Sequence, residues 1–320
     1  MPAIFLWSVV DLLKRFLTCC NYAFVPLVAM VIGSVLHMLW LWVFVTFFEM
    51  GANGVPMAMI LTESLKLVII YTYARCLPEM EKALFLPTMD VFSGWGQYLK
   101  LAIPTILMLG PEWWAFEFLI IMAGFIGVKE QAVIVISLSL LGILFMFPLG
   151  FSEAAAAVVG NSMGENEPDL AKKYIRVTAM IAVPTQLTFI LLTYLLRSQI
   201  SSLYFNPDSV EHPLLVSVIS VMVIESIFDL SQGLLQGPLR ALTLQFKASI
   251  ICIVCNWVFG IPFCALFAFK LDMGIQGLWY GLIIALTLQF GAYLTILLTS
   301  DYEKIAEEVH ASHTKALEKK

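Results

Sequence analysis

The chain has 320 residues, of which 60% are hydrophobic and only 13% carry a charge, and its mean hydropathy is +0.90. These values are typical of a polytopic membrane protein and exclude an ordinary globular enzyme or binding domain. The net charge of -5 is dispersed and no block of Lys or Arg residues is present, so we expect no nucleic-acid partner.

The apolar runs predict an all-α integral membrane protein, a polytopic helical bundle. Because a helix needs about 20 apolar residues to cross the hydrocarbon core, polar and turn-rich breaks divide the chain into eight spans. We place them near residues 22–48, 51–76, 98–126, 131–160, 175–197, 213–236, 245–269 and 275–299. The apolar segment 1–10 precedes them, but Asp11 follows it and ten helical residues rise only about 15 Å, so we expect half a span there.

Lys and Arg residues favour the cytoplasmic side of a membrane protein, and here they alternate between successive loops. Of the 18 Lys and Arg residues, only Lys129, Arg197 and Lys270 fall on one side and Lys66 lies within a span. The remainder fall on the other side, which is therefore predicted to be cytoplasmic and to hold the C-terminus.

Two turns of related sequence, residues 49–54 and 272–277, share the pattern M-G-x-x-G, and each is followed by a span. Repeats are common in transporters, although glycine at a tight turn also has its own backbone reason. The repeat suggests two related bundles. We expect a partial amino-terminal lobe over 1–97 (half a helix, two spans and a cytoplasmic linker), a complete six-helix lobe over 98–300, and a cytoplasmic tail over 301–320.

Acidic residues inside the spans are the main functional signal, because a charged side chain at the centre of a bilayer costs about 2.5 to 3.5 kcal/mol on insertion scales. Glu112 and Glu117 follow Pro104 and Pro111 in the span 98–126, and prolines of this kind bend helices that line cavities. The two acids are about 140° apart around a helix, so we expect them to occupy different environments.

A second helix, 213–236, carries Glu225 and Asp229 four residues apart, continued by Gln232 and Gln236 at helical spacing. These side chains form one polar stripe, which faces protein or water rather than lipid. The stripe is either a proton or cation site or a hydrogen-bonded contact between helices.

Other polar residues have simpler explanations. Glu153 follows Pro148 among small residues, where an interhelical hydrogen bond and a role in transport are equally open. Glu63 and Lys66, three residues apart, are predicted to pair, and His37 to be a packing residue. The six cysteines lie in or beside apolar segments, so we expect no metal site and no other cofactor.

Proton exchange is the chemistry that buried acids can perform. Keeping a Glu neutral at pH 7, from a reference pKa of about 4.3, costs about 3.7 kcal/mol, which is similar to the insertion penalty of the charged form. The two protonation states are therefore nearly balanced. A cationic substrate would favour the ionised acid, and an arriving proton would displace that substrate.

Several motifs together resemble the multidrug and toxic compound extrusion (MATE) transporters, especially their eukaryotic branch. Residues 101–104 with 112–117 look like the family's seventh-helix signature, residues 148–164 are similar to its P-x-G-x-S/G-x-A-A…N-x-L-G region, and residues 300–303 resemble its T-D-W-E ending. The resemblance covers nearly the whole chain. It places Met1 inside the family's fourth helix, so we expect about three preceding helices of the family to be absent here.

The resemblance implies an antiporter, not an enzyme, that exports organic cations, xenobiotics or amphipathic metabolites by alternating access between two lobes. Its coupling ion would be H⁺, with Na⁺ as the alternative. The resemblance implies that Glu112 and Asp229 form the proton and substrate-cation site, with Glu117 in support. We expect the cavity also to be lined by Trp113, Trp114, Glu153, Glu225 and Gln232.

The chain departs from the family pattern at Glu153 and Glu225, which add acids, and at Glu63 and Lys66, which replace an aromatic residue and an amide. Two functional classes therefore stay open. The chain either transports a small cationic or amphipathic molecule, or is a truncated non-transporting paralogue or isoform that pairs with and regulates full-length transporters. Both predict a multi-pass protein among the lipids of a plasma or vacuolar-type membrane.

Overall fold

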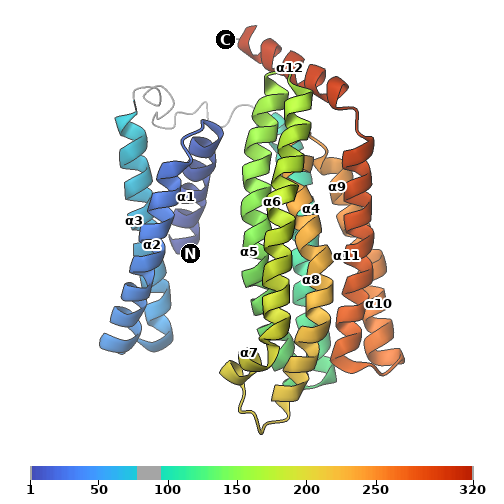
Figure 1. Cartoon of the computed structure of the whole chain (residues 1–320). Coiled ribbons are helices and arrows are strands. Elements are labelled where there is room, and N and C mark those ends of the chain that lie inside the picture. Colours follow the sequence, from blue (N-terminus) through green and yellow to red (C-terminus); the bar gives the residue numbers. More distant parts are fainter. Residues whose placement is uncertain (1, 78–94, 319–320) are drawn as a thin grey trace. The chain divides into compact units, whose positions relative to one another are not determined.

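All the secondary structure of the described residues, 2–77 and 95–318 of the computed structural model, is helical (Figure 1). The chain divides into two compact units, Met1–Ser93 (unit 1) and Gly94–Lys320 (unit 2). Eight helical segments of the described residues are long and apolar enough to cross a membrane: Phe24–Phe47, Gly51–Cys76, Tyr98–Ile126, Val128–Gly164, Pro168–Leu195, Glu211–Ala241, Gln245–Lys270 and Gly274–Thr299. The predicted all-α membrane fold is therefore confirmed. Most of the predicted cytoplasmic linker, with Lys82, lies outside the described residues.

Unit 1 begins with a helix that is longer than the predicted half span. Its elements are α1 (Pro2–Cys19), α2 (Phe24–Leu41) with a π-helical continuation (Trp42–Phe47), a 3-10 turn (Gly51–Asn53) and α3 (Gly54–Cys76). Helix α1 continues through Asp11 because Lys14 Nζ and Arg15 Nε pair with that carboxylate at 2.6 and 2.8 Å. Pairs at this spacing support a helix and compensate the charge within it.

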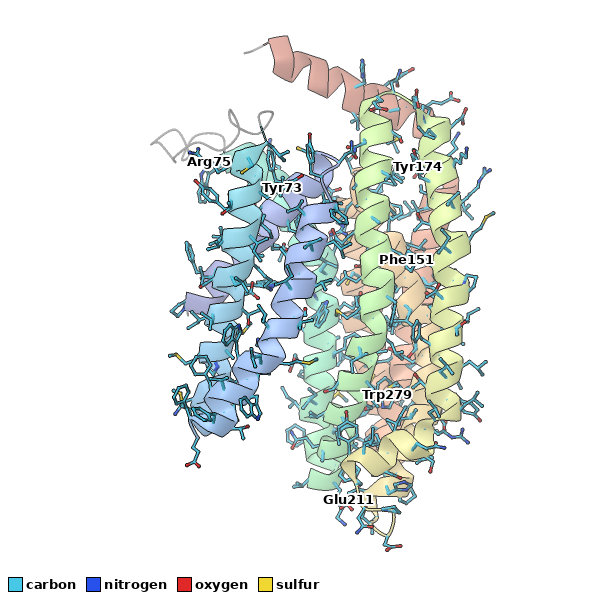
Figure 2. The ribbon with its side chains drawn as sticks, turned by 60° about the vertical axis from the view of Figure 1, so that its left-hand side comes forward. Tyr73, Arg75, Phe151, Tyr174, Glu211 and Trp279 are labelled. Atoms are coloured by element: carbon cyan, nitrogen blue, oxygen red, sulfur yellow. The ribbon has the colours of Figure 1, made fainter. Side chains whose placement is uncertain are left out.

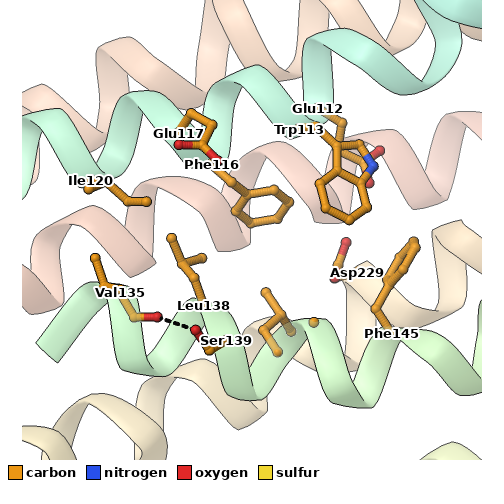
Figure 3. Close-up of a pocket in the computed structure, with 12 residues that line it drawn as sticks. Glu112, Trp113, Phe116, Glu117, Ile120, Val135, Leu138, Ser139, Phe145 and Asp229 are labelled. Carbon is orange, nitrogen blue, oxygen red and sulfur yellow. Dashed lines mark hydrogen bonds between the residues drawn. The ribbon is translucent and has the colours of Figure 1, made fainter. Parts of the chain in front are cut away.

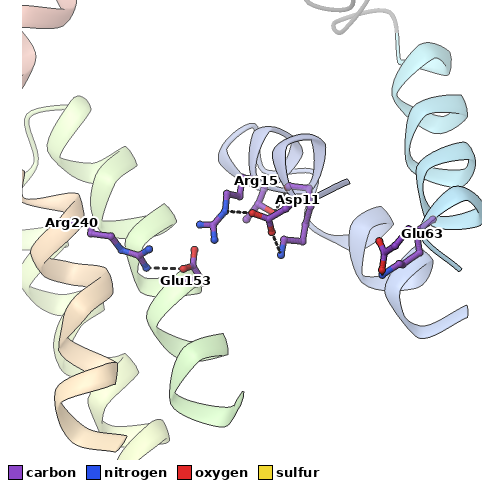
Figure 4. A network of polar contacts seen from close by, with 8 residues as sticks. Asp11, Arg15, Glu63, Glu153 and Arg240 are labelled. Carbon is purple, nitrogen blue, oxygen red and sulfur yellow. Dashed lines mark hydrogen bonds and ion pairs between the residues drawn. The ribbon is translucent and has the colours of Figure 1, made fainter. Parts of the chain in front are cut away.

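The polar residues inside the spans of unit 1 pair locally. Lys66 Nζ lies 2.5 Å from Oε1 of Glu63, which Figure 4 labels. Both side chains are buried. His37 Nδ1 on α2 lies 2.9 Å from Thr62 Oγ1 on α3. The predicted Glu63–Lys66 pair is thus confirmed, and His37 has a hydrogen-bond partner as expected of a packing residue.

Unit 2 is a bundle of long helices that run side by side (Figure 1). Its elements follow in chain order: α4 (Trp95–Ile126), α5 (Val128–Gly164), α6 (Pro168–Leu195), α7 (Arg197–Tyr204), α8 (Glu211–Ala241), α9 (Gln245–Ile253), a π-helical segment (Val254–Gly260), α10 (Ile261–Ala265), a second π-helical segment (Leu266–Lys270), α11 (Gly274–Thr299) and α12 (Tyr302–Glu318). The predicted span 245–269 is therefore one continuous but irregular helix, and α7 is a short helix that the span pattern does not show.

Helix α8 is the central helix of unit 2. More than half of its most apolar stretch, 56%, is buried within the structure, the largest share among the candidate spans of the described residues. It packs against α5, α6 and α11, and close approach to α5 depends on Gly237, where a Cβ would overlap the backbone of Ser152. The Gly237 N–H donates to Ser152 Oγ at 2.7 Å. Polar side chains on α8 are therefore held inside protein rather than in lipid.

Apolar side chains fill the interior of unit 2, and charged side chains lie at the ends of its helices (Figure 2). Trp279 on α11 is fully buried in the main apolar cluster of unit 2, whereas Glu211 lies at the start of α8 and pairs with Lys129 at 3.1 Å. At the opposite end, α12 packs on α5 and α6, and Ala306 is buried against them. The predicted tail is thus a helix docked on the bundle.

The two M-G-x-x-G turns have the same backbone conformation. Glu49 and Gly51 have φ values of 51° and 54°, and the corresponding Asp272 and Gly274 have 54° and 58°. These are left-handed values, which glycine adopts readily and other residues seldom do. The sequence repeat therefore corresponds to a structural repeat in each unit.

The helices that flank these turns also match. A π-helical segment precedes each turn, and the last glycine of each motif packs directly on that preceding segment. A Cβ at Gly54 would meet the backbone of Phe44, and a Cβ at Gly277 would meet the backbone of Ala268. The second glycine is needed for close helix packing, in addition to the turn itself.

The close packing of α10 on α11 can be tested at Gly281, whose Cβ position overlaps the backbone of Cys264. We expect Gly281→Ala to lower the melting temperature of the purified chain, since overpacking of a tight contact costs about 1–3 kcal/mol. Gly291→Ala on the same helix is the matched control, because nothing lies within 4 Å of its Cβ position. It should be neutral or slightly stabilising; equal effects at the two positions would contradict the packing described.

Candidate functional site

Helix α4 brings Glu112 into the interior of unit 2. Pro104 and Pro111 lie inside this helix, and proline supplies no backbone N–H to the helical ladder. The carbonyl of Pro111 accepts a hydrogen bond at 2.9 Å from Trp257 Nε1, which comes from the π-helical segment after α9. Such segments are frequent at functional sites. Two irregular helices are therefore joined next to Glu112.

The Glu112 carboxylate is 2% exposed and is held by three side-chain amides. Gln232 Nε2 donates to its Oε1 at 2.9 Å, while Gln289 Nε2 and Gln236 Nε2 donate to its Oε2 at 2.8 and 3.3 Å. These donors come from α8 and α11. A carboxylate that accepts three N–H groups is stabilised in its ionised form, because every donor points at the negative charge.

Asp229 is the second acid of the site. It is 1% exposed, and its Oδ1 accepts a hydrogen bond from Gln232 Nε2 at 3.1 Å. Gln232 therefore bridges Asp229 and Glu112. Its own Oε1 accepts hydrogen bonds from Gln236 and Gln289, each at 2.9 Å. Every donor and acceptor of the Gln232 amide therefore has a partner.

The amide network extends to a fourth helical segment. Asn256 Nδ2 donates to Gln289 Oε1 at 2.6 Å and to the Cys252 carbonyl at 3.0 Å. We refer to Gln232, Gln236, Gln289 and Asn256 as the amide cage. Among the described residues, no Lys, Arg or His side chain hydrogen-bonds to the cage or to the two acids. The negative charges of Glu112 and Asp229 are therefore not neutralised by a cationic side chain of the described residues.

A cavity of about 230 Å³ opens beside the two acids, between α4, α5 and α8 (Figure 3). This volume is smaller than that of a typical small-molecule pocket, which is about 300–1,000 Å³. It is lined by Glu112, Trp113, Phe116, Glu117, Ile120, Val135, Leu138, Ser139, Leu141, Gly142, Phe145 and Asp229. The cavity thus joins carboxylates on one wall to aromatic and aliphatic side chains on the others.

Aromatic rings form part of the cavity wall. The Trp113 and Phe145 rings meet edge to face with centroids 6.3 Å apart, and Phe116 lies on the next turn of α4. Glu117 lines the same cavity from an exposed position, whereas Glu112 is buried in the amide cage. Glu112 and Glu117 therefore differ in burial, as their separation around the helix predicted, although both line the same cavity.

Four of the expected cavity residues do not line this cavity in the described part of the chain. Trp114 is 57% exposed, and Gln232 lies behind the wall in the amide cage. Glu153 on α5 pairs with Arg240 on α8 at 2.7 Å, as Figure 4 shows. Glu225 is fully buried on α8, outside the set of lining residues.

Gln236 was predicted only as part of the polar stripe on α8, and two further members of the amide cage, Gln289 and Asn256, were not singled out from the sequence. Each is an amide inside an apolar span, at 275–299 and 245–269 respectively, and that signal was available. A lone amide in a span is common at helix contacts, however, and one sequence does not show which helices face one another.

Comparison with known proteins gives a consistent family assignment. The MatE family model matches residues 104–266. Protein DETOXIFICATION 16 of Arabidopsis thaliana is 28% identical over 303 residues, covering 94% of this chain and 62% of that protein. Multidrug and toxin extrusion protein 1 of Danio rerio is 28% identical over 312 residues, covering 96% and 52%. The chain therefore spans about half to three-fifths of the length of these relatives.

Solved structures agree on the fold. The crystal structure of the eukaryotic MATE transporter AtDTX14 superposes with a TM-score of 0.91 at 23% identity, covering 97% of this chain and 70% of that chain. A mutant of the Vibrio cholerae MATE transporter VcmN gives a TM-score of 0.74 at 17% identity, covering 94% and 69%. The family model, the eight spans and the fold together show that this integral, multi-pass membrane chain belongs to the MATE family of multidrug and toxin extrusion transporters.

Proposed function

We propose that this chain forms the proton-coupled part of a secondary antiporter that exports small organic cations in exchange for H⁺. The observation that supports it best is the pair of buried acids, Glu112 and Asp229, which share the donor Gln232 and face an aromatic cavity. The relatives whose names refer to multidrug and toxin extrusion are longer than this chain. The proposal therefore concerns the part that this site plays in binding the cation and the proton.

The exchange follows from competition between two kinds of positive charge. When Glu112 and Asp229 are both ionised, a cation in the cavity compensates two negative charges that the described structure otherwise leaves uncompensated. When a proton binds, one of these charges disappears and the cation loses its counter-charge. Because substrate and proton favour opposite states of the same carboxylates, each lowers the affinity for the other.

A proton fits the site better than Na⁺ as the coupling ion. Hard cations require several oxygen ligands at once. Here the oxygens of Glu112 already accept three N–H groups, and the side-chain oxygens of Gln232 and Gln289 accept hydrogen bonds within the cage. A proton needs only one lone pair of one carboxylate, and it can bind without dismantling the cage.

The cavity wall favours a cation with an apolar or aromatic body. A positive charge within about 6 Å of a Trp, Tyr or Phe ring gains about 0.5 to 2 kcal/mol. Trp113, Phe116 and Phe145 supply rings next to the Glu112 and Asp229 carboxylates. The small volume favours a compact organic cation, or the charged head of a larger amphipathic molecule.

We also propose that the α12 end of unit 2 is cytoplasmic. The ends of α6, α8 and α9 that lie there carry Lys172, Arg240 and Lys247, and α12 adds Lys304. The opposite end holds fewer basic residues: Lys129, Arg197 and Lys270 lie in its loops and helix ends. An excess of basic residues marks the cytoplasmic side of membrane proteins.

Transport can be tested with the purified chain in lipid vesicles that carry an imposed pH gradient and a fluorescent organic cation. We expect Glu112→Gln and Asp229→Asn each to lower the affinity for the cation by about 30-fold or more, because loss of one partner of a buried charge pair costs about 2 kcal/mol or more. Glu307→Gln, at an exposed acid on α12, is the control and should transport normally. Full cation affinity or full activity of Glu112→Gln would contradict the proposal, whereas absence of efflux by the unmodified chain would favour the non-transporting alternative.

The two adjacent tryptophans provide a matched test of the substrate site, because Trp113 lines the cavity and Trp114 does not. We expect Trp113→Leu to raise the dissociation constant of an aromatic cation about 2- to 30-fold, which is the loss of one cation–π contact. Trp114→Leu should leave it unchanged. Binding is measured by isothermal titration calorimetry, and equal effects of the two substitutions would rule out the cavity as the substrate site.

A further inference from the structure

Glu225 is the acid that the proposed exchange does not use. Its side chain is 0% exposed on α8, one turn before Asp229, and it does not line the cavity. Both of its carboxyl oxygens are buried without a hydrogen-bond partner among the described residues. The nearby hydroxyl of Ser226 donates instead to the Met222 carbonyl, at 2.8 Å. Glu112, by contrast, has three amide donors and Asp229 has one.

The charged surroundings of Glu225 are all acidic. Asp229, on the same helix, and Glu112, on α4, both repel a negative charge on Glu225. Helices α5, α6, α7, α9 and α11 also pack against α8, and within the described residues they add no ionisable group that acts on Glu225. No cation of the described chain compensates it.

Burial of this kind selects the neutral acid. An ionised carboxylate without donors or a counter-ion is far less stable inside a protein than a neutral carboxyl group that lacks a partner. Repulsion from ionised Asp229 and Glu112 disfavours the charge further. Glu225 therefore holds a proton while the other two acids are ionised.

We infer that Glu225 is a third proton-binding group of this site, one that contacts no substrate and that loses its proton more readily when a cation fills the cavity. A bound cation compensates Glu112 and Asp229 and so weakens their repulsion of a charge on Glu225. The O–H bond of Glu225 then breaks, its electron pair stays on the carboxylate, and the proton passes to water. The inference deepens the proposed antiport and rests on it for the cation that occupies the cavity.

The number of protons released with each bound cation tests this inference. The full-length chain is titrated with 1-methylpyridinium by calorimetry in buffers of different ionisation enthalpy, which yields that number directly. We expect E225Q to bind the cation but to release fewer protons than the unmodified chain, by up to about one per cation. Glu307→Gln, at the exposed acid on α12, should release as many as the unmodified chain. Equal proton release by E225Q and the unmodified chain would overturn the inference.

Infrared spectroscopy gives a readout that does not depend on the substrate. The cation-free chain at neutral pH should show the carbonyl stretch of protonated carboxyl groups, and the component contributed by Glu225 should be missing from the E225Q spectrum and retained in the E112Q spectrum. If E225Q does not fold, Glu225→Met provides the same comparison with an apolar side chain. Identical bands with and without Glu225 would show that this residue is ionised. Failure of the chain to bind any cation would count against the proposed function, while the infrared band would still decide the state of Glu225.

Discussion

The hydrogen bonding of one buried carboxylate, Glu112, determines the arrangement of helices around the site. An acid in an apolar bundle is tolerated only where donors or counter-charges surround it. Here the donors are Gln232, Gln236 and Gln289, which bring α8 and α11 against α4, and Asn256 extends the same network to the π-helical segment after α9. Four segments distant in sequence thus converge on one charge.

The balance between this stabilisation and burial explains why the site can exchange protons. A net hydrogen bond to a charged group contributes about 1.5 to 3 kcal/mol, and Glu112 accepts three of them. These bonds favour the ionised form, whereas burial and the neighbouring acid Asp229 favour the neutral one. Opposing effects of similar size leave a group whose protonation a single bound cation can change.

Sequence patterns were sufficient for the spans but not for the geometry of the site. The length and apolar character of each segment predicted the eight spans, because the bilayer imposes a minimum length on all of them. The M-G-x-x-G repeat predicted matching turns, since left-handed backbone angles restrict the residue type. Both signals are local.

The contacts between helices were not predictable in the same way. The stripe on α8 indicated that Asp229 and Gln232 share a face, but it did not show that this face meets Glu112 or that Gln289 completes the cage. Trp114 and Glu153 were expected to line the cavity, yet rotation along α4 turns Trp114 outward and Arg240 holds Glu153 elsewhere. Rotation and pairing depend on tertiary packing, which a single sequence does not specify.

The most direct test of the central claim, that Glu112 and Asp229 together form the cation site, is an experimental structure of the chain with a bound compact aromatic cation such as 1-methylpyridinium. The account predicts that the cation occupies the cavity beside α4, with its charge next to the Glu112 and Asp229 carboxylates and its ring against Trp113 and Phe145. Density for the cation at another place in the chain, with this cavity unchanged, would contradict it.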